Sequence, residues 1–265
     1  MYRRWGKILG KSREEVKSAV NSFVRQINAG DPEGLMKHQT EDFVFIDYDG
    51  DTTRGRDGWH GYFQDYSDYK IHVKHIVISG TGAALIGETT GCHVGPEVER
   101  EWTILWTAEA RDDLLSEWRI YSDVHEVRER LDIEERPTKL KEHSEAVKSA
   151  ALSFVDRINA GDSKGLMELQ SEGFTLVDYE GEVYRGRSGW EDYFEECPNY
   201  KIHVSHVITS GNGVAILGRT TGSHVSPEVE EKETILWIAQ IRDGLVAEWR
   251  LYSDTEEVEK QIAKT

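Results

Sequence analysis

The stretch INAGDPEGLM at residues 27–36 returns as INAGDSKGLM at residues 158–167, and this repetition decides how the chain is organised. Two further pairs, RGRDGW with RGRSGW and EWRIYSD with EWRLYSD, have the same offset of 131 residues, so the copies align without an insertion or a deletion. A unit of this length is large enough to fold as a domain with its own core. The sequence therefore predicts one domain duplicated in tandem.

Composition limits the classes of partner. The 265 residues carry a formal charge of −17, which argues against nucleic-acid and anionic membrane surfaces, because these attract basic proteins. No apolar run approaches the roughly 20 residues that a membrane helix needs. The two cysteines, Cys92 and Cys197, align with Ser223 and Tyr66 of the opposite copies, so they predict free thiols, a reducing compartment and a cytoplasmic protein.

Each half begins with helical patterns and continues with strands. Apolar residues recur at helical spacing over residues 16–27, and Ser12 with Glu15 forms a capping box at the start. Two shorter helices are expected, at residues 31–36 and 58–63. The expected strands of the first half lie at residues 43–48, 71–79, 83–94, 102–110 and 114–123.

The predicted first domain covers residues 1–131, with residues 1–11 as an N-terminal extension that the second copy lacks. The second domain covers residues 142–265. The charged segment 132–141, which contains Pro137, is the predicted linker.

This order of elements resembles the nuclear-transport-factor-2-like superfamily, and within it the SnoaL-like branch. The resemblance rests on the helix ending in NAGD, on DYDG followed by RGRDGW, and on the closing GLVAEWRLYSD. It implies a curved sheet wrapped around the helices as a cone, with an apolar pocket at the open end. Members include ketosteroid isomerase, scytalone dehydratase and polyketide cyclases, but also binding and associative domains, so the fold leaves the function open.

Domains of this family commonly pair through the outer faces of their sheets, and the resemblance extends that expectation to the two copies. The prediction is an α+β protein of two tandem cone-shaped domains, each with N-terminal helices packed on a curved, mostly antiparallel β-sheet, arranged as a pseudo-dimer. The outward strand residues expected at the contact between the domains are Glu109, Arg119, Tyr121, Gln240, Arg250 and Tyr252.

Strand alternation selects the side chains that face the inside of each cone. Asp47 lies two residues after Phe45 on one strand, and His75 lies two residues after Val73 on another, so both are expected to face inward. A carboxylate and an imidazole in a partly dry cone are suited to moving a proton, as base and acid. The predicted catalytic residues of the two copies are Asp47, His75, Asp178 and His206. The alternative is that Asp47 caps the turn at residues 49–50 and that His75 is a hydrogen-bonded core residue.

Aromatic and polar side chains are expected around these residues as a pocket wall. The residues are Trp59, Tyr62, His93, Trp106 and Trp118 in the first copy, and Trp190, Tyr193, His224, Trp237 and Trp249 in the second. The alternative is that the tryptophans form the core and that the histidines are structural. His72 and His75 point to opposite faces of one strand, so no metal site is expected, and no phosphate-binding loop or cofactor motif is present.

Three functions remain open at this point. The first is a cofactor-independent acid–base isomerase, dehydratase or cyclase that acts on a small apolar carbonyl or hydroxy compound. The second is non-catalytic binding of a hydrophobic small molecule. The third is a scaffold whose cones are filled by their own tryptophans.

Overall fold

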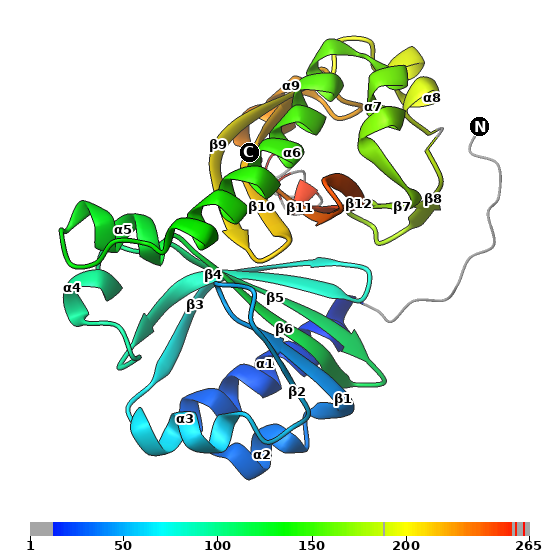
Figure 1. Ribbon diagram of the computed structural model, residues 1–265. Coiled ribbons are helices and arrows are strands. Elements are labelled where there is room, and N and C mark those ends of the chain that lie inside the picture. The colour runs from blue at the N-terminus through cyan, green and yellow to red at the C-terminus, as the bar shows by residue number, and fades with distance from the viewer. Residues whose placement is uncertain (1–12, 188, 256–257, 259–261, 263–265) are drawn as a thin grey trace.

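The computed structural model describes residues 13–187, 189–255, 258 and 262, and it shows two domains of the same architecture (Figure 1). The extension predicted at residues 1–11 and the predicted helix cap Ser12 lie outside the described residues. Among the described residues, no helix is long and apolar enough to cross a membrane.

Each domain contains helices and one six-stranded sheet. The first domain consists of α1 (Arg13–Ala29), α2 (Pro32–Met36), β1 (Gln39–Ile46), β2 (Thr52–Arg54), α3 (Trp59–Asp65), β3 (Lys70–Ser79), β4 (Gly82–Thr90), α4 (Pro96–Glu99), β5 (Ile104–Arg111), β6 (Leu114–Ser122) and α5 (Val124–Arg130). The second consists of α6 (Thr138–Ala160), α7 (Ser163–Leu169), β7 (Gln170–Val177), β8 (Val183–Arg185), α8 (Gly189–Glu196), β9 (Lys201–Ser210), β10 (Gly213–Thr221), α9 (Pro227–Lys232), β11 (Ile235–Arg242) and β12 (Leu245–Tyr252).

The strand order is the same in the two sheets, β2-β1-β6-β5-β4-β3 and β8-β7-β12-β11-β10-β9. Neighbouring strands are antiparallel, except that β1 runs parallel to β6 and β7 runs parallel to β12. The predicted α+β class with a mostly antiparallel sheet is therefore confirmed.

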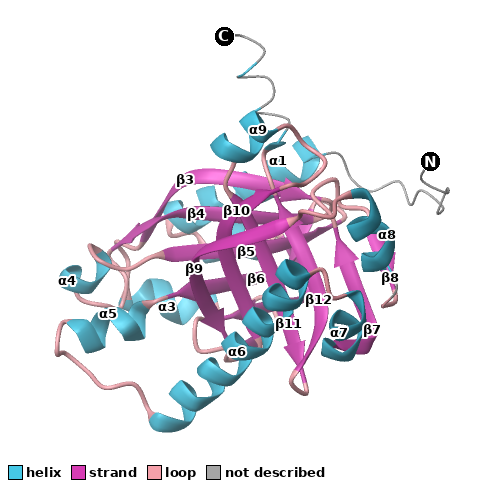
Figure 2. Cartoon of the chain, turned by 90° about the horizontal axis from the view of Figure 1, so that it is seen from above, coloured by secondary structure: helices cyan, strands magenta, loops and turns pink. Residues whose placement is uncertain are grey.

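Helix α1 lies on one face of the first sheet, and α6 lies on the corresponding face of the second (Figures 1 and 2). The apolar positions of α1 recur at helical spacing, so one stripe of the helix is buried. Phe23 of this stripe is fully buried, and its ring lies 5.1 Å from Trp118 and 5.9 Å from Phe43 of the sheet. Burial of an aromatic side chain of this size contributes roughly 2–3 kcal/mol to folding.

The short helix after α1 starts as its sequence dictates. Asp31 is the N-cap of α2, its Oδ1 accepts a hydrogen bond of 2.9 Å from the backbone N–H of Gly34, and Pro32 occupies the first turn. Asp162 caps α7 through Gly165 in the same way, at 2.8 Å. The repeated NAGD motif therefore places the chain at the start of the sheet in both domains.

Several elements differ from their predicted bounds. The short strands β2 and β8 and the helices α4, α9 and α5 were not predicted. Strand β4 ends at Thr90 because the chain turns into a loop at Gly91, whose φ is +72°. Helix α6 already begins at Thr138, so the last four residues of the predicted linker are its first turn.

A β-bulge in β3 reverses the faces that simple alternation predicts. Val73 pairs with Gly87 and His75 pairs with Ile86, so Lys74 is an extra residue in this strand. Before the bulge Ile71 faces the first core, whereas after it Ile78 does. His75 is therefore on the outer face, and the same bulge at Ser205 places His206 there.

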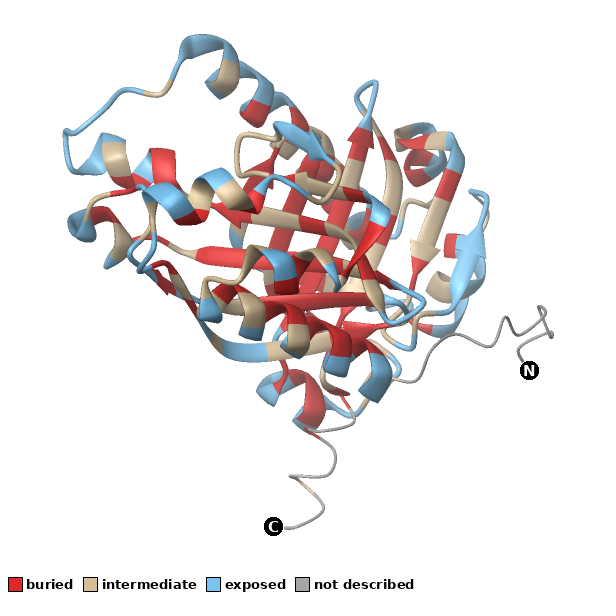
Figure 3. Ribbon diagram, turned by 90° about the horizontal axis from the view of Figure 1, so that it is seen from below, coloured by how far each residue is buried: buried red, intermediate tan, exposed pale blue. Residues whose placement is uncertain are grey.

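The two sheets pack against each other through their outer faces. A third apolar cluster joins the domains and consists of Ala84, Leu105, Tyr121, Ile208, Ala215, Leu236, Ile238 and Tyr252. Arg250 of the second domain forms an ion pair of 2.7 Å with Glu109 of the first, and Arg119 donates to the backbone oxygen of Ser210. The predicted outward residues thus lie at this contact, and Figure 3 shows the middle of the sheets as buried.

Candidate functional site

The first domain carries a group of aromatic and polar side chains at the edge of its core. This tyrosine–histidine cluster consists of Tyr48, Tyr62, Tyr66, His93 and His125. Its members come from the turn after β1, from α3 and its C-cap, from the loop after β4, and from α5.

His93 occupies the centre of the cluster. The Tyr48 hydroxyl lies 3.0 Å from Nε2 of His93, and the Tyr62 hydroxyl lies 3.5 Å from Nδ1. The ring planes of Tyr48 and His93 are within 11° of parallel. Both ring nitrogens of the histidine therefore face a phenol hydroxyl, so one nitrogen can donate and the other can accept.

His125 extends the cluster to a carboxylate. Its Nε2 lies 2.6 Å from Oδ1 of Asp49, and its ring meets the ring of Tyr48 edge-on at 5.7 Å. The side chain of His125 is buried, at 8% exposure, whereas that of Asp49 is 30% exposed, so the contact joins the interior of the cluster to the surface. Asp49, His125, Tyr48 and His93 thus form one continuous series of contacts.

The loop that carries His93 is fixed by Glu99 of α4. The Glu99 carboxylate accepts hydrogen bonds from the backbone N–H of Cys92 at 3.0 Å and of Gly91 at 3.3 Å. Gly91 also passes close to the loop before β3, because a Cβ at this position would lie 2.6 Å from the backbone oxygen of Asp68. The PEVE motif and the glycine before the histidine therefore hold the imidazole in place.

Burial determines the protonation states in the cluster. It lowers the pKa of His93 from its ordinary value of 6.5, so the imidazole is neutral at pH 7. Burial also raises the pKa of Tyr48 to about 12 and that of Tyr62 further, so both phenols keep their protons. The cluster thus presents a neutral imidazole between two phenol hydroxyls, one of which donates to it while the other accepts from it.

The second domain has only part of this arrangement. The ring of Tyr179 stacks on His224 at 6.3 Å, which repeats the contact of Tyr48 with His93. The position of Tyr66 is occupied by Cys197, and Asp49 is replaced by Glu180. The position of His125 is a glutamate in the sequence, at residue 256, which lies outside the described residues. The sequence therefore cannot form a second carboxylate–histidine pair there.

The structure does not bring the predicted catalytic residues together. Asp47 lies at the end of β1, and its Oδ1 accepts hydrogen bonds of 2.9 Å from the backbone N–H groups of Asp49 and Asp51. Its carboxylate therefore caps the turn, as the alternative interpretation states, and Asp178 caps the turn before Glu182 in the same way. The strand β1 ends at Ile46, so alternation no longer determines the face of Asp47.

The inward orientation predicted for His75 and His206 is wrong. The bulges turn both side chains to the outer face, where His75 lies 3.1 Å from Asp254 and His206 lies 3.8 Å from Asp123 of the opposite domain. Within one sheet, β1 and β3 are also four strand spacings apart, which is about 19 Å. Asp47 and His75 therefore do not form an acid–base pair.

The tryptophans and the two tyrosines predicted for the pocket wall lie in or against the cores, whereas His93 and His224, which were predicted beside them, are exposed to solvent. Trp106, Trp118 and Trp237 are fully buried, Trp249 is 1% exposed, and Trp59 and Trp190 are 7% exposed. Tyr62 and Tyr193 pack against these cores. The indole N–H groups of Trp106, Trp118 and Trp237 have no hydrogen-bond partner within the part of the chain that the structure describes.

Tyr48, Tyr66, Asp49 and His125 were not predicted from the sequence. Tyr48 follows Asp47 in the DYDG segment, beyond the end of β1 at Ile46, so strand alternation does not indicate the direction of its side chain. His125 follows the last strand in a helix that no sequence pattern indicated. In the described residues, no group of three or more histidine, cysteine or acidic side chains is arranged to hold a metal ion, and both cysteines are free thiols.

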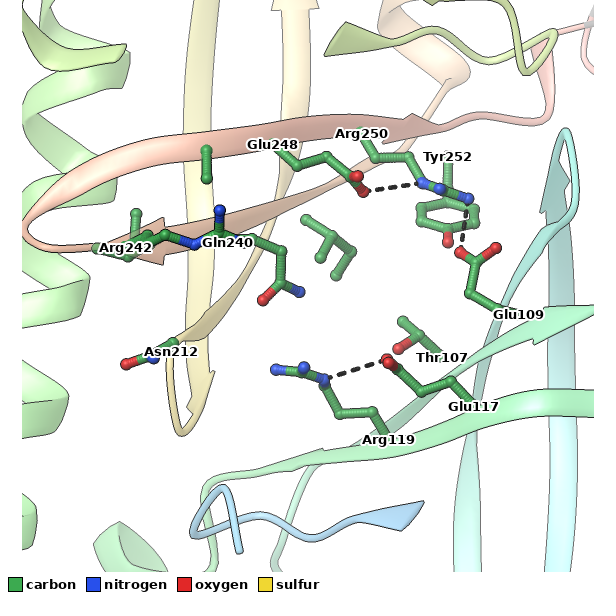
Figure 4. Close-up of a pocket in the computed structure, with 13 residues that line it drawn as sticks. Thr107, Glu109, Glu117, Arg119, Asn212, Gln240, Arg242, Glu248, Arg250 and Tyr252 are labelled. Carbon is green, nitrogen blue, oxygen red and sulfur yellow. Dashed lines mark hydrogen bonds and ion pairs between the residues drawn. The ribbon is translucent and has the colours of Figure 1, made fainter. Parts of the chain in front are cut away.

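A separate cavity of 390 Å³ lies between the two sheets (Figure 4). The charged and polar residues that line it are Thr107, Glu109, Glu117, Arg119, Asn212, Gln240, Arg242, Glu248, Arg250 and Tyr252. Arg250 contacts two carboxylates here, Glu109 at 2.7 Å and Glu248 at 3.3 Å. Arg119 has Glu117 at 3.5 Å, and Gln240 stands at the position equivalent to Glu109.

The SnoaL-like domain family matches the chain twice, over residues 20–118 and 151–249. The chain belongs to the SnoaL-like family. The matches cover both domains and confirm the resemblance that the repeated motifs indicated.

Solved structures with the same type of fold are similar to one half of the chain. An NTF2-like protein of unknown function from Cytophaga hutchinsonii is 14% identical, with a TM-score of 0.36, over 43% of this chain and 94% of that chain. An LEH-like epoxide hydrolase from M. tuberculosis is 18% identical, with a TM-score of 0.38, over 44% of this chain and 88% of that chain. No match to a curated protein was found.

Proposed function

We propose that this SnoaL-like protein binds a small, largely apolar carbonyl or hydroxy compound in its first domain, between the tyrosine–histidine cluster and the tryptophans of the core. The observation that carries the proposal is the neutral His93 held between the hydroxyls of Tyr48 and Tyr62. The buried indole N–H groups of Trp106 and Trp118 support it, because a ligand oxygen would satisfy a donor that is costly to leave unpaired.

In this proposal His93 is the group that exchanges a proton with the ligand. A neutral imidazole can accept a proton from a carbon next to a carbonyl, while the phenol hydroxyls donate hydrogen bonds to the oxygen where negative charge develops. This chemistry suits an isomerase, a dehydratase or a cyclase. The proposal also includes a cytoplasmic location, in keeping with the free cysteines, and a pseudo-dimeric unit formed within one chain.

The test compares two equivalent histidines. His93→Gln removes the imidazole of the first domain, and His224→Gln removes its counterpart in the second. We expect His93→Gln to weaken the binding of 2-naphthol or cyclohexanone by roughly tenfold, the loss of one or two hydrogen bonds, and His224→Gln to leave it nearly unchanged. Calorimetric titration of the full chain measures both affinities, and binding should persist somewhat below pH 6.5 because the lowered pKa keeps His93 neutral.

A second candidate function is a scaffold without a ligand. It is favoured by the near-complete burial of Trp106, Trp118, Trp237 and Trp249, since aromatic side chains occupy the interior of both cones. The absence of any thermal shift in the wild type and in both histidine variants, across a panel of lipophilic carbonyl and hydroxy compounds, would support the scaffold over the binding protein.

A further inference from the structure

We propose that each domain positions the cluster of the other: a hairpin tip of the second domain holds the turn that carries Tyr48 and Asp49, and a hairpin tip of the first holds the turn that carries Tyr179. The first of these contacts makes Ser210 a positioning residue for the His93 site, although it belongs to the other domain. The inference goes beyond the proposed function, because it concerns the second domain's role in building the site.

The turn at residues 47–51 connects the domain contact with the site. Ser210, at the end of β9, donates a hydrogen bond of 2.7 Å to the backbone oxygen of Asp47. The same turn holds Tyr48, whose hydroxyl contacts His93, and Asp49, whose carboxylate contacts His125. A displacement of this turn therefore reaches both histidines of the cluster.

The turn is stiff enough to transmit such a displacement. Oδ1 of Asp47 holds the backbone N–H groups of Asp49 and Asp51, and the backbone of Gly50 donates back to the oxygen of Asp47. Gly50 has a φ of +89° and lies directly against Gly211, so that a Cβ on Gly50 would be 2.2 Å from the Cα of Gly211. Hairpin tip and turn therefore meet backbone to backbone, and no flexible side chain separates them.

The contact occurs a second time with the domains exchanged. Ser79 donates a hydrogen bond of 2.7 Å to the backbone oxygen of Asp178, and Gly80 lies against Gly181. The turn supported there carries Tyr179, which stacks on His224. This turn has an additional brace, because Arg13 donates a hydrogen bond of 2.9 Å to the backbone oxygen of Tyr179.

The repetition supplies a matched pair of variants. Ser210→Ala and Ser79→Ala each remove one hydroxyl that is fully buried and one cross-domain hydrogen bond of the same length. A purely structural role predicts the same result for both variants. Mutual positioning predicts a crossed result, in which each variant changes the histidine of the opposite domain.

The experiment records the ring C–H resonances of His93, His125 and His224 in the full-length chain by NMR over a pH titration. We expect Ser210→Ala to shift the resonances and the titration midpoint of His93, to shift the resonances of His125, and to leave His224 unchanged. Ser79→Ala should shift His224 alone, and by less, because Arg13 still holds that turn. The readout needs no ligand, so it is independent of whether the proposed binding occurs.

Three outcomes would overturn the inference: shifts confined to the domain that carries the substitution, equal shifts of all three histidines in both variants, or no shift in either. Unchanged tryptophan indole resonances show that both cores remain folded. If Ser210→Ala changes the indole resonances, a second variant decides. Ser210→Thr retains the hydroxyl, and it must show both wild-type indole resonances and wild-type His93 resonances for the inference to stand. Where 2-naphthol binds, Ser210→Ala should weaken it by roughly fivefold, as the loss of one hydrogen bond on a supporting turn suggests.

Discussion

The side chains of Asp47 and Asp178 stabilise a backbone turn and do not form the predicted acid–base pair. Each carboxylate accepts two backbone N–H groups of the turn that follows, and each backbone oxygen accepts a serine hydroxyl from the other domain. Burial raises the pKa of both carboxyls above 3.8, while the N–H groups oppose that rise by stabilising the charged form. Both copies carry aspartate at this position, and both use it to cap the same turn.

Substitution of Asp47 separates the structural role from a catalytic one. Asp47→Ala removes the Oδ1 atom that accepts both N–H groups, and it should lower the free energy of unfolding by about 1–2 kcal/mol, as the loss of a helix or turn cap does. Asp47→Asn keeps an oxygen at the same place and should lose less than half of that. Urea unfolding measures both changes, and Asp47→Asn should bind 2-naphthol as the wild type does. If the Asp47→Asn variant folds normally but loses binding or turnover, Asp47 has a catalytic or binding role after all.

The sequence was sufficient for some site residues and insufficient for others, and the reason is local geometry. Trp106 and Trp118 lie in regular stretches of β5 and β6, where alternation holds, so their inward direction was predicted correctly. Tyr48 follows the end of β1, and His125 lies on a helix after the last strand, so neither belongs to a periodic pattern. The position of Tyr48 and His125 near His93 depends on tertiary packing, which residue spacing in the sequence does not indicate.

At the scale of the element, the bulge in β3 decides which residues meet the other domain. The extra residue Lys74 lets Ile71 and Ile78 face the same core, although their positions differ by seven, an odd number that would put them on opposite faces of a regular strand. The outer face then receives His75, Val77 and Ser79, which reach the second domain or the apolar cluster between the domains. Without this bulge Ser79 would point away from the turn it supports.

Glycine opposite the bulge is required by the close approach of the two strands. A Cβ on Gly87 would lie 2.3 Å from the backbone oxygen of His72, and Gly218 has the same contact with His203. Gly87→Ala should therefore lower the free energy of unfolding by about 1–3 kcal/mol, since backbone atoms of β3 must move. Gly61→Ala is the control: Gly61 lies in α3 with no atom within 4 Å of its Cβ position, so alanine should stabilise the protein by about 0.5–1 kcal/mol. Equal effects of the two substitutions in thermal unfolding would show that the bulge does not need its glycine.

The element order was predictable because helical spacing, alternation and turn residues agree along most of each copy. Helices α1 and α2 and the long strands were found within a few residues of their bounds. The bulges were not found, because an extra residue in a strand leaves the composition and the apolar content unchanged. Helix α5 spans only seven residues, of which Val124, His125 and Val127 are buried, so its apolar pattern is too short to indicate a helix.

At the scale of the whole molecule, the duplicated contact is symmetric at its serines and glycines, but it departs from symmetry at the Arg13 brace and in the cavity between the sheets. The serine, glycine and histidine contacts occur in both directions, whereas the ion pair of Arg250 with Glu109 has no equivalent at Arg119 (Figure 4). Gln240 occupies the place where symmetry would put a second carboxylate. The same contact between the domains therefore occurs twice in this chain, once with a carboxylate at Glu109 and once with a neutral amide at Gln240.

Glu109 should make stability depend on pH. Burial raises its pKa above 4.5 by more than Arg250 lowers it, so the folded chain binds this proton more tightly than the unfolded chain does. The contribution of Glu109 therefore decreases the free energy of unfolding as pH rises from about 4.5 through the raised pKa. Glu109→Gln removes this pH-dependent contribution to the free energy of unfolding. Its stability should match the wild type near pH 4 and exceed it at pH 7.5 by a few tenths to about 1 kcal/mol, because the group is partly exposed.

Gln240→Glu tests the same balance from the other side. It places a carboxylate opposite Arg119, as Glu109 stands opposite Arg250, and should lower the free energy of unfolding at pH 7.5 while having little effect near pH 4. Urea unfolding measures the difference in the free energy of unfolding between each of the two variants and the wild type, at pH 4 and at pH 7.5. If attraction to arginine outweighed burial, both signs would reverse: Glu109→Gln would destabilise the protein at pH 7.5 and Gln240→Glu would stabilise it. In that case the neutral Gln240 would make the domain contact less stable than a glutamate would. The advantage of glutamine would then have to come from its place in the lining of the cavity.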